Sequence, residues 1–201
     1  MFEDPKIKPA LMKRVVEASL SLGEVLYIDY DLQFSSILQN IDEIDYAGTF
    51  GKNLQVMQPS DNALDFISDI ASIEMHRGGI LILDSLNSLQ NTIAGNFLEV
   101  EAKIANQRSA LVITILQQVS RFYSKSLLIV NVARARQKLR IDRSTFWEKS
   151  LVGGRMIKFK SDMILFAKET LDGLPAIEVR AERIGSSREP KAKEETYLLS
   201  L

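Results

Sequence analysis

Residues 80–84 of this chain are Ile-Leu-Ile-Leu-Asp, and this short apolar run that ends in an acid decides the fold. An unbroken apolar run is typical of a strand buried on both faces of a parallel sheet, whereas a half-exposed strand alternates apolar with polar residues. Similar β-forming runs occur at residues 24–30 and 127–130, and a shorter one occurs at 54–57. The sequence therefore predicts a mostly parallel sheet.

Segments with apolar residues at helical spacing alternate with these runs and predict helices. They are residues 12–22, 32–40, 60–73 (capped by Ser60 or Asp61) and 97–123. Beyond residue 160 the pattern changes to short β-forming segments at 161–168, 176–181 and 196–199. We predict one α/β domain over residues 1–201, with a mostly parallel central sheet, helices on both faces and a C-terminal antiparallel β extension.

The composition excludes several classes of site. The 201 residues contain no cysteine and a single histidine, which excludes disulfides and thiolate chemistry and argues against a histidine-based zinc site. No apolar run reaches the roughly 18–20 residues of a membrane span. The first five residues are acidic and end in proline, unlike a secretory signal. We expect a cytoplasmic protein with no membrane partner.

Acids and amides follow three of the predicted strands. Asp29 and Asp31 follow the first, Asp84 and Ser85 the third, and Asn131 the last. Ligands of open parallel sheets bind beyond the carboxyl ends of the strands, where a carboxylate can hold the water shell of Mg²⁺. Strand-end acids also occur because the N-termini of helices favour negative charge. Spacing alone leaves both interpretations open.

Four segments occur in the order and spacing of a known family core. They are EVLYIDYDLQF (24–34), LQVMQPSDNALDFISDIA (54–71), ILILDSLNSLQN (80–91) and LLIVNVARAR (127–136). Over residues 10 to 200 the chain resembles the core of the RecA/RadA recombinases, as in an archaeal-type RadA paralogue. The resemblance implies that Asp84 is the magnesium aspartate and that Asp31 takes the place of the water-activating carboxylate. It also implies DNA-binding loops at about 91–107 and 137–151.

The departures from the family concern nucleotide binding. A phosphate-binding loop of the form G-x-x-x-x-G-K-[ST] should precede the helix at residue 12, yet no glycine precedes Gly23. The look-alike at residues 48–53 has the wrong glycine spacing and precedes a strand. Val132 stands where the family has a phosphate-sensing glutamine. We expect a degenerate ATPase without a nucleotide site or cofactor, in which Asp31 and Asp84 are remnants unless a partner subunit shares Mg²⁺ and ATP.

Residues 132–160 hold nine basic and two acidic residues, although the whole chain carries a net charge of -1. Basic residues neutralise phosphates and aromatic rings stack on unpaired bases. We expect single-stranded DNA to contact Arg134, Arg136, Lys138, Arg140, Arg143, Phe146, Trp147 and Lys149. The alternative is that the cations are simply solvated and the two rings pack onto the body of the protein.

Three functions stay open at this point. The first is a non-catalytic RadA-like paralogue that assists recombination or repair by binding single-stranded DNA, a related recombinase subunit, or further copies of itself. Residues 1–10 lack the family's Phe-x-x-Ala tether, which argues against self-assembly by that route. The second is a pseudo-ATPase scaffold for signalling or motility that never contacts DNA. The third is an ATPase whose phosphate loop was lost by truncation.

Overall fold

The computed structural model describes residues 7–39, 50–59, 65–95, 102–132, 134–139, 145–150, 161–169, 176–183 and 194–200. The chain divides into two compact units. Residues 9–130 form the first, which we call the parallel-sheet unit, and residues 1–8 with 131–201 form the second unit. That residues 1–201 make one domain stays a prediction.

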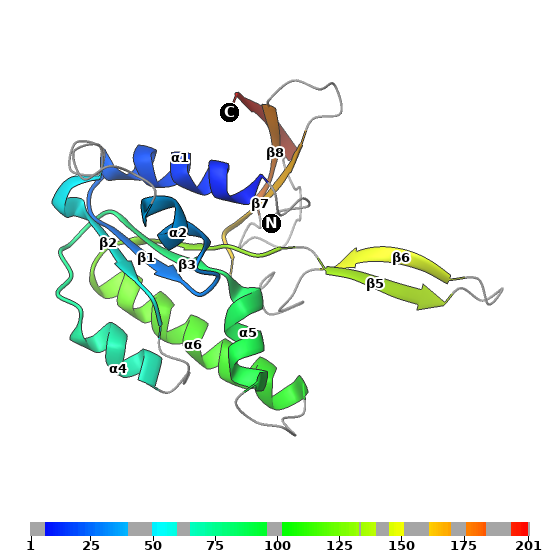
Figure 1. Cartoon of the computed structure of the whole chain (residues 1–201), viewed down its shortest axis with the longest axis horizontal. Helices are drawn as coiled ribbons and strands as arrows, with labels where there is room; N and C mark the ends of the chain where they lie inside the picture. The colour runs from blue at the N-terminus through cyan, green and yellow to red at the C-terminus, as the bar shows by residue number, and fades with distance from the viewer. Residues whose placement is uncertain are drawn as a thin grey trace. The chain divides into compact units, whose positions relative to one another are not determined.

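The parallel-sheet unit is a four-stranded sheet covered by helices. Its strands are β1 (Val25–Asp29), β2 (Leu54–Met57), β3 (Ile80–Asp84) and β4 (Ser126–Ile129), all parallel and in the order β2-β1-β3-β4. Its helices are α1 (Lys8–Leu20), α2 (Gln33–Gln39), α4 (Asp65–Ser72), α5 (Leu86–Gly95) and α6 (Ala102–Phe122), with a 3-10 turn η1 (Gly51–Asn53) before β2. Helices α1 and α2 lie on one face of the sheet and α4 and α6 on the other (Figure 1). The predicted α/β class with a parallel sheet is confirmed.

Burial explains the apolar runs of the sequence. Strands β1 and β3 are central in the sheet, and every residue of β1 is buried, as are the last four of β3. Strands covered on both faces have no solvated side, so polar alternation would leave polar side chains in the core. The outer strands β2 and β4 are only partly buried, in keeping with their place at the edges.

Helix α6 shows the predicted helical period on its inner face. The buried residues of this face recur three or four positions apart and are Ala105, Ser109, Val112, Ile113, Leu116 and Ser120. The helix was predicted from residue 97, and the described part begins at Ala102. Helix α5 was not predicted. It begins after Ser85, whose Oγ accepts a hydrogen bond from the amide of Ser88 (3.3 Å), as an N-cap does.

The second unit contains two antiparallel sheets. Strands β5 (Arg134–Leu139) and β6 (Thr145–Ser150) pair as a hairpin, and β7 (Met163–Glu169), β8 (Ala176–Arg183) and β9 (Glu194–Ser200) form a three-stranded sheet. The three C-terminal strands were predicted, whereas their joining to the parallel sheet stays a prediction. Much of the stretch expected to be a DNA-binding loop, residues 137–151, is strand. Its alternation of charged with small or apolar residues is the period of a strand.

The turn before β3 brings two backbones into contact. Gly79 has a φ of +81°, and a Cβ at this position would lie 2.0 Å from the carbonyl oxygen of Glu24. The amide of Ile80 donates to that oxygen (2.9 Å), and the amide of Ser126 donates to the carbonyl of Gly79 (2.9 Å). Residue 79 therefore aligns β3 with both β1 and β4 and has no room for a side chain.

We expect Gly79→Ala to lower the free energy of unfolding by about 2–5 kcal/mol, because it adds a left-handed backbone penalty to a backbone clash. The matched control is Gly51→Ala, where φ is +55° but no atom lies within 4 Å of the new Cβ. That change should cost only about 1–2 kcal/mol, the backbone penalty alone. Urea unfolding followed by circular dichroism measures both, and equal losses would contradict the close approach at Gly79.

Candidate functional site

The carboxyl edge of the parallel sheet brings two of the singled-out acids together. Asp29 and Asp84 are the last residues of β1 and β3 and are partners in the strand register. Their side chains are 0% and 1% exposed. Neighbouring strands are about 4.8 Å apart, so two buried carboxylates lie close together and need strong hydrogen-bond donors. The source of those donors decides what this edge can do.

Asp29 receives its hydrogen bonds from the first turn of α2. Its Oδ2 accepts from the amide (2.7 Å) and from the Oγ (2.8 Å) of Ser35. A carboxylate in this place satisfies a free amide of the helix N-terminus and complements the helix dipole. The buried Oδ1 has no hydrogen-bond partner among the described residues. Asp29 therefore fixes α2 against the end of β1.

Asp84, the predicted magnesium aspartate, is held by a tyrosine that the sequence analysis did not single out. The hydroxyl of Tyr27, in the middle of β1, donates to Oδ2 of Asp84. Burial, and then the charge of Asp84, raise the pKa of Tyr27 far above its ordinary value of 10.0, so the hydroxyl stays protonated. Phe34 of α2 stacks on the Tyr27 ring with centroids 4.2 Å apart. One oxygen of Asp84 is thus directed at a protein donor.

Asp31, the predicted water-activating carboxylate, lies at the N-terminus of α5. Its Oδ1 accepts hydrogen bonds from Oγ of Ser85 (3.0 Å) and from Oγ of Ser88. The structure therefore brings Asp31 to the N-cap of a helix, which is one of the two interpretations that spacing left open. Across the described parts of the chain, no group of three His, Cys, Asp or Glu side chains could hold a metal ion.

The predicted DNA-contacting residues belong to the second unit. Arg134, Arg136 and Lys138 lie in β5, where they pair in register with Ser150, Glu148 and Phe146. Trp147 and Lys149 of β6 pair with Gln137 and Ala135, so they take the alternate register positions. Arg140 and Arg143 lie outside the described residues. Register positions along a hairpin alternate between two sets. Basic residues occur in both sets here, namely Arg134, Arg136 and Lys138 in one and Lys149 in the other.

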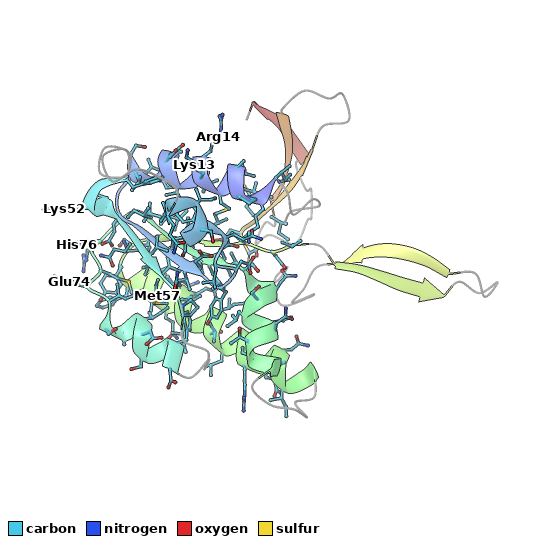
Figure 2. The ribbon with its side chains drawn as sticks, viewed as in Figure 1. Lys13, Arg14, Lys52, Met57, Glu74 and His76 are labelled. Carbon is cyan, nitrogen blue, oxygen red and sulfur yellow. The ribbon has the colours of Figure 1, made fainter. Side chains whose placement is uncertain are left out.

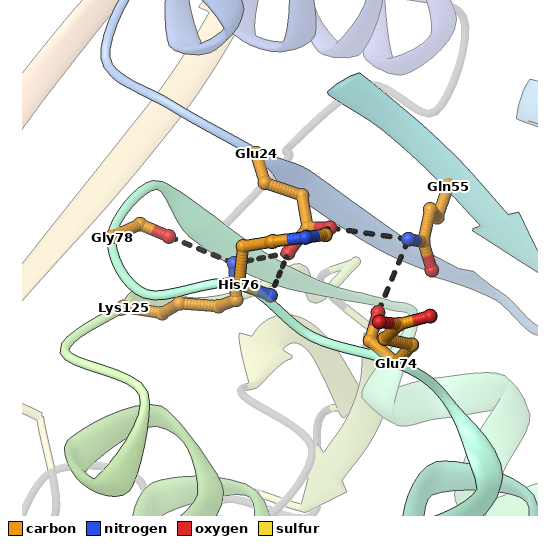
Figure 3. Close-up of polar contacts among 6 residues, drawn as sticks. All are labelled: Glu24, Gln55, Glu74, His76, Gly78 and Lys125. Carbon is orange, nitrogen blue, oxygen red and sulfur yellow. Dashed lines mark hydrogen bonds and ion pairs between the residues drawn. The ribbon is translucent and has the colours of Figure 1, made fainter. Parts of the chain in front are cut away.

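The opposite, amino edge of the parallel sheet holds a polar cluster that the sequence analysis did not predict (Figure 3). Lys125, which precedes β4, donates to Oε2 of Glu24 (2.6 Å) and to the carbonyl of Gly78 (2.8 Å). Gln55 donates to Oε1 of the same carboxylate (3.1 Å). The amide of His76 donates to Oε2 (3.1 Å), and its ring Nδ1 lies 3.2 Å from Oε1. Glu24 therefore links segments next to all four strands.

This amino-edge cluster is buried at its centre and open at its rim. The side chain of Lys125 is 0% exposed and that of Glu24 8%, whereas His76 is 75% exposed. Glu74 and His76 project at this edge of the unit together with Lys52 (Figure 2). A sequence signal did exist, because Glu24 and Lys125 are charged residues placed just before the strands β1 and β4. Their mutual pairing could not be inferred from it.

The sequence comparisons add no relative. No protein-family model matches the chain, and no curated protein matches it. In the described parts of the chain, no helix combines the length and the apolar character needed to cross a membrane.

The stability of the fold should depend on Glu24 in a pH-dependent way. Burial raises the pKa of Glu24, but the hydrogen bonds from Lys125 and His76 and the charge of Lys125 outweigh it, so the pKa lies below its ordinary 4.5. A lowered pKa stabilises the fold above pH 4.5, and this contribution is lost as the pH falls through the folded value. Glu24→Gln should cost about 3–5 kcal/mol at neutral pH by leaving Lys125 buried and unpaired.

The measurement is urea unfolding of wild type and variant between neutral and strongly acid pH, where the difference between them should shrink as the pH falls. Glu17→Gln serves as the control, because Glu17 forms only a surface pair with Lys13 (3.7 Å). It should change the free energy of unfolding by less than about 1 kcal/mol at any pH. A Glu24 effect that does not vary with pH would refute the role of this ion pair.

Tyr27 lies in β1 and Tyr30 is the residue just after this strand. We expect the two to respond differently to loss of the hydroxyl group. Tyr27→Phe removes the donor to buried Asp84 and should cost about 1–3 kcal/mol of unfolding free energy. The hydroxyl of Tyr30 is buried with no hydrogen-bond partner among the described residues, so Tyr30→Phe should be neutral or stabilising. Thermal and urea unfolding compare the two. Equal destabilisation would argue against the Tyr27–Asp84 bond.

Proposed function

We propose that this chain is a non-catalytic, RecA-like paralogue that assists DNA recombination or repair by binding single-stranded DNA, a related recombinase subunit, or both. The observation that carries the DNA part of the proposal is the basic hairpin β5–β6. Arg134, Arg136 and Lys138 occupy every second position of β5. Such positions are about 6.8 Å apart, so three cations span about 14 Å and can neutralise successive phosphates of an extended strand.

The non-catalytic part of the proposal rests on how the acids are used. A magnesium aspartate must direct its oxygens at the metal or at its water shell. One oxygen of Asp84, Oδ2, instead accepts from Tyr27, and one oxygen of Asp31, Oδ1, accepts from two serines at the start of α5. The glycine-containing look-alike also fails as a phosphate loop, since Gly51–Asn53 is a 3-10 turn that leads directly into β2. Each observation supports a remnant ATPase edge with a structural role.

A second candidate function draws on the same acids. If the carboxyl edge only holds helices, the chain could act as a pseudo-ATPase scaffold that binds another protein and no DNA. The two candidates differ in salt dependence, because binding dominated by phosphate contacts weakens steeply as salt rises.

The test of the DNA proposal is charge reversal in the basic segment. We expect the triple variant Arg136→Glu, Lys138→Glu, Arg140→Glu to lose binding to a fluorescent single-stranded oligonucleotide, since three phosphate contacts are replaced by repulsion. The wild-type chain should bind with an affinity that falls with salt, and each phosphate contact contributes a slope of about −0.7 on a log–log plot. Fluorescence anisotropy at several salt concentrations measures both quantities.

The matched control reverses three exposed cations of the parallel-sheet unit, namely Lys13, Arg14 and Lys52 (Figure 2). Lys13→Glu, Arg14→Glu, Lys52→Glu changes the net charge by the same amount, so it should keep most of the affinity if the hairpin is the site. Equal losses in the two triple variants would show a nonspecific charge effect and refute the hairpin. Wild-type chain that binds no oligonucleotide would favour the scaffold.

A further inference from the structure

The register of the β5–β6 hairpin divides its residues between two faces. Residues paired across an antiparallel sheet lie on the same face, and successive residues of a strand lie on opposite faces. One face, which we call the basic face, holds the pairs Arg134 with Ser150, Arg136 with Glu148 and Lys138 with Phe146. The other, which we call the tryptophan face, holds the pairs Ala135 with Lys149, Gln137 with Trp147 and Leu139 with Thr145.

The two faces differ in composition. Four of the six residues on the basic face are charged, three of them cations, and its one apolar residue is Phe146. The tryptophan face has a single charge, on Lys149, and three apolar residues, Ala135, Leu139 and Trp147. Antiparallel sheets commonly pack their apolar face and leave the other face in water. The basic face is therefore the one suited to a charged ligand.

The two aromatic residues of the hairpin cannot share one ligand strand. Phe146 and Trp147 are neighbours in β6, so they lie on opposite faces. A DNA strand that follows the cations of β5 runs along the basic face, where Phe146 is the register partner of Lys138. The Cβ atoms of such partners are about 5 Å apart, so one nucleotide can meet both a cation and a ring. The backbone of the sheet separates this strand from Trp147.

We infer that single-stranded DNA binds the basic face alone, with Phe146 as the ring on which a base stacks, and that Trp147 takes no part in binding. This inference rests on the proposed function and deepens it, because it assigns the face and the ring that recognise the strand. It narrows the expectation from the sequence that both rings contact DNA. It also gives Glu148, the register partner of Arg136, a role. A carboxylate on the binding face repels phosphate and so limits the affinity for DNA.

The first test uses the fluorescence of Trp147, which is the single tryptophan of the chain. An indole ring loses fluorescence when a base stacks on it. Saturation of the wild-type chain with an unlabelled oligothymidylate should therefore leave its tryptophan emission nearly unchanged. The exchange variant Phe146→Trp, Trp147→Phe moves the tryptophan to the basic face, so the same oligonucleotide should remove most of its emission.

The second test compares matched losses of the two rings by fluorescence anisotropy with a labelled oligothymidylate. Phe146→Leu should weaken binding about 5- to 140-fold, the range expected for one lost base stack, and Trp147→Leu less than about twofold. Phe146→Tyr keeps a ring and should bind like the wild type. Circular dichroism shows whether each variant is folded, and the emission of the wild-type chain decides the question if one of them is not.

The third test removes the carboxylate of the basic face. Glu148→Gln should raise the affinity for the oligonucleotide about twofold or more at low salt, and the gain should shrink as salt screens the charges. Glu17→Gln is the matched control, because it removes the same charge from the parallel-sheet unit, where Glu17 forms a surface pair with Lys13. This control should leave the affinity unchanged.

The outcomes separate this inference from the proposed function. A wild-type chain that binds no oligonucleotide overturns both. Binding that strongly quenches Trp147 in the wild type, or that Trp147→Leu weakens as much as Phe146→Leu does, overturns the choice of face and leaves DNA binding intact. Equal effects of Glu148→Gln and Glu17→Gln overturn the place of Glu148 on the binding face.

Discussion

Two carboxylates, Asp29 and Asp84, end the two central strands side by side. Neighbouring residues at the carboxyl edge donate hydrogen bonds to both of them. Both side chains are buried, so each needs hydrogen-bond donors close by. Their donors therefore come from the protein: the first turn of α2 supplies Ser35, and β1 itself supplies Tyr27. The position of α2 over the sheet and the stacking of Phe34 on Tyr27 follow from this constraint.

The amino edge of the sheet is held by a different device. A buried ion pair between Glu24 and Lys125 and the backbone crossing at Gly79 connect the entry points of the strands. An ion pair at this depth is costly to desolvate, and the additional hydrogen bonds to its carboxylate from Gln55 and His76 offset part of that cost. The sheet is thus fixed at both edges by buried charge, with apolar packing between them.

This arrangement bears on the proposed function because the strand-end acids of the parallel-sheet unit accept hydrogen bonds from its own side chains. The acids that the recombinase resemblance assigns to magnesium and water are hydrogen-bonded to Tyr27, Ser85 and Ser88. The alternating cations of β5, on which the DNA part of the proposal rests, belong to the second unit. The hydrogen bonds to the strand-end acids support the proposed role of the chain as a non-catalytic binding partner.

The sequence by itself determined the parallel strands and most helices, because an apolar run or a helical period is a local property of the chain. It missed α5, whose only start signal is Ser85, and it assigned a loop to the basic segment despite that segment's strand-like alternation. Which role the strand-end acids take was decided only by the tertiary structure. Tyr27 and Asp84 are 57 residues apart, and Glu24 and Lys125 are 101 apart. Contacts over such separations depend on strand order and register, which no local pattern encodes.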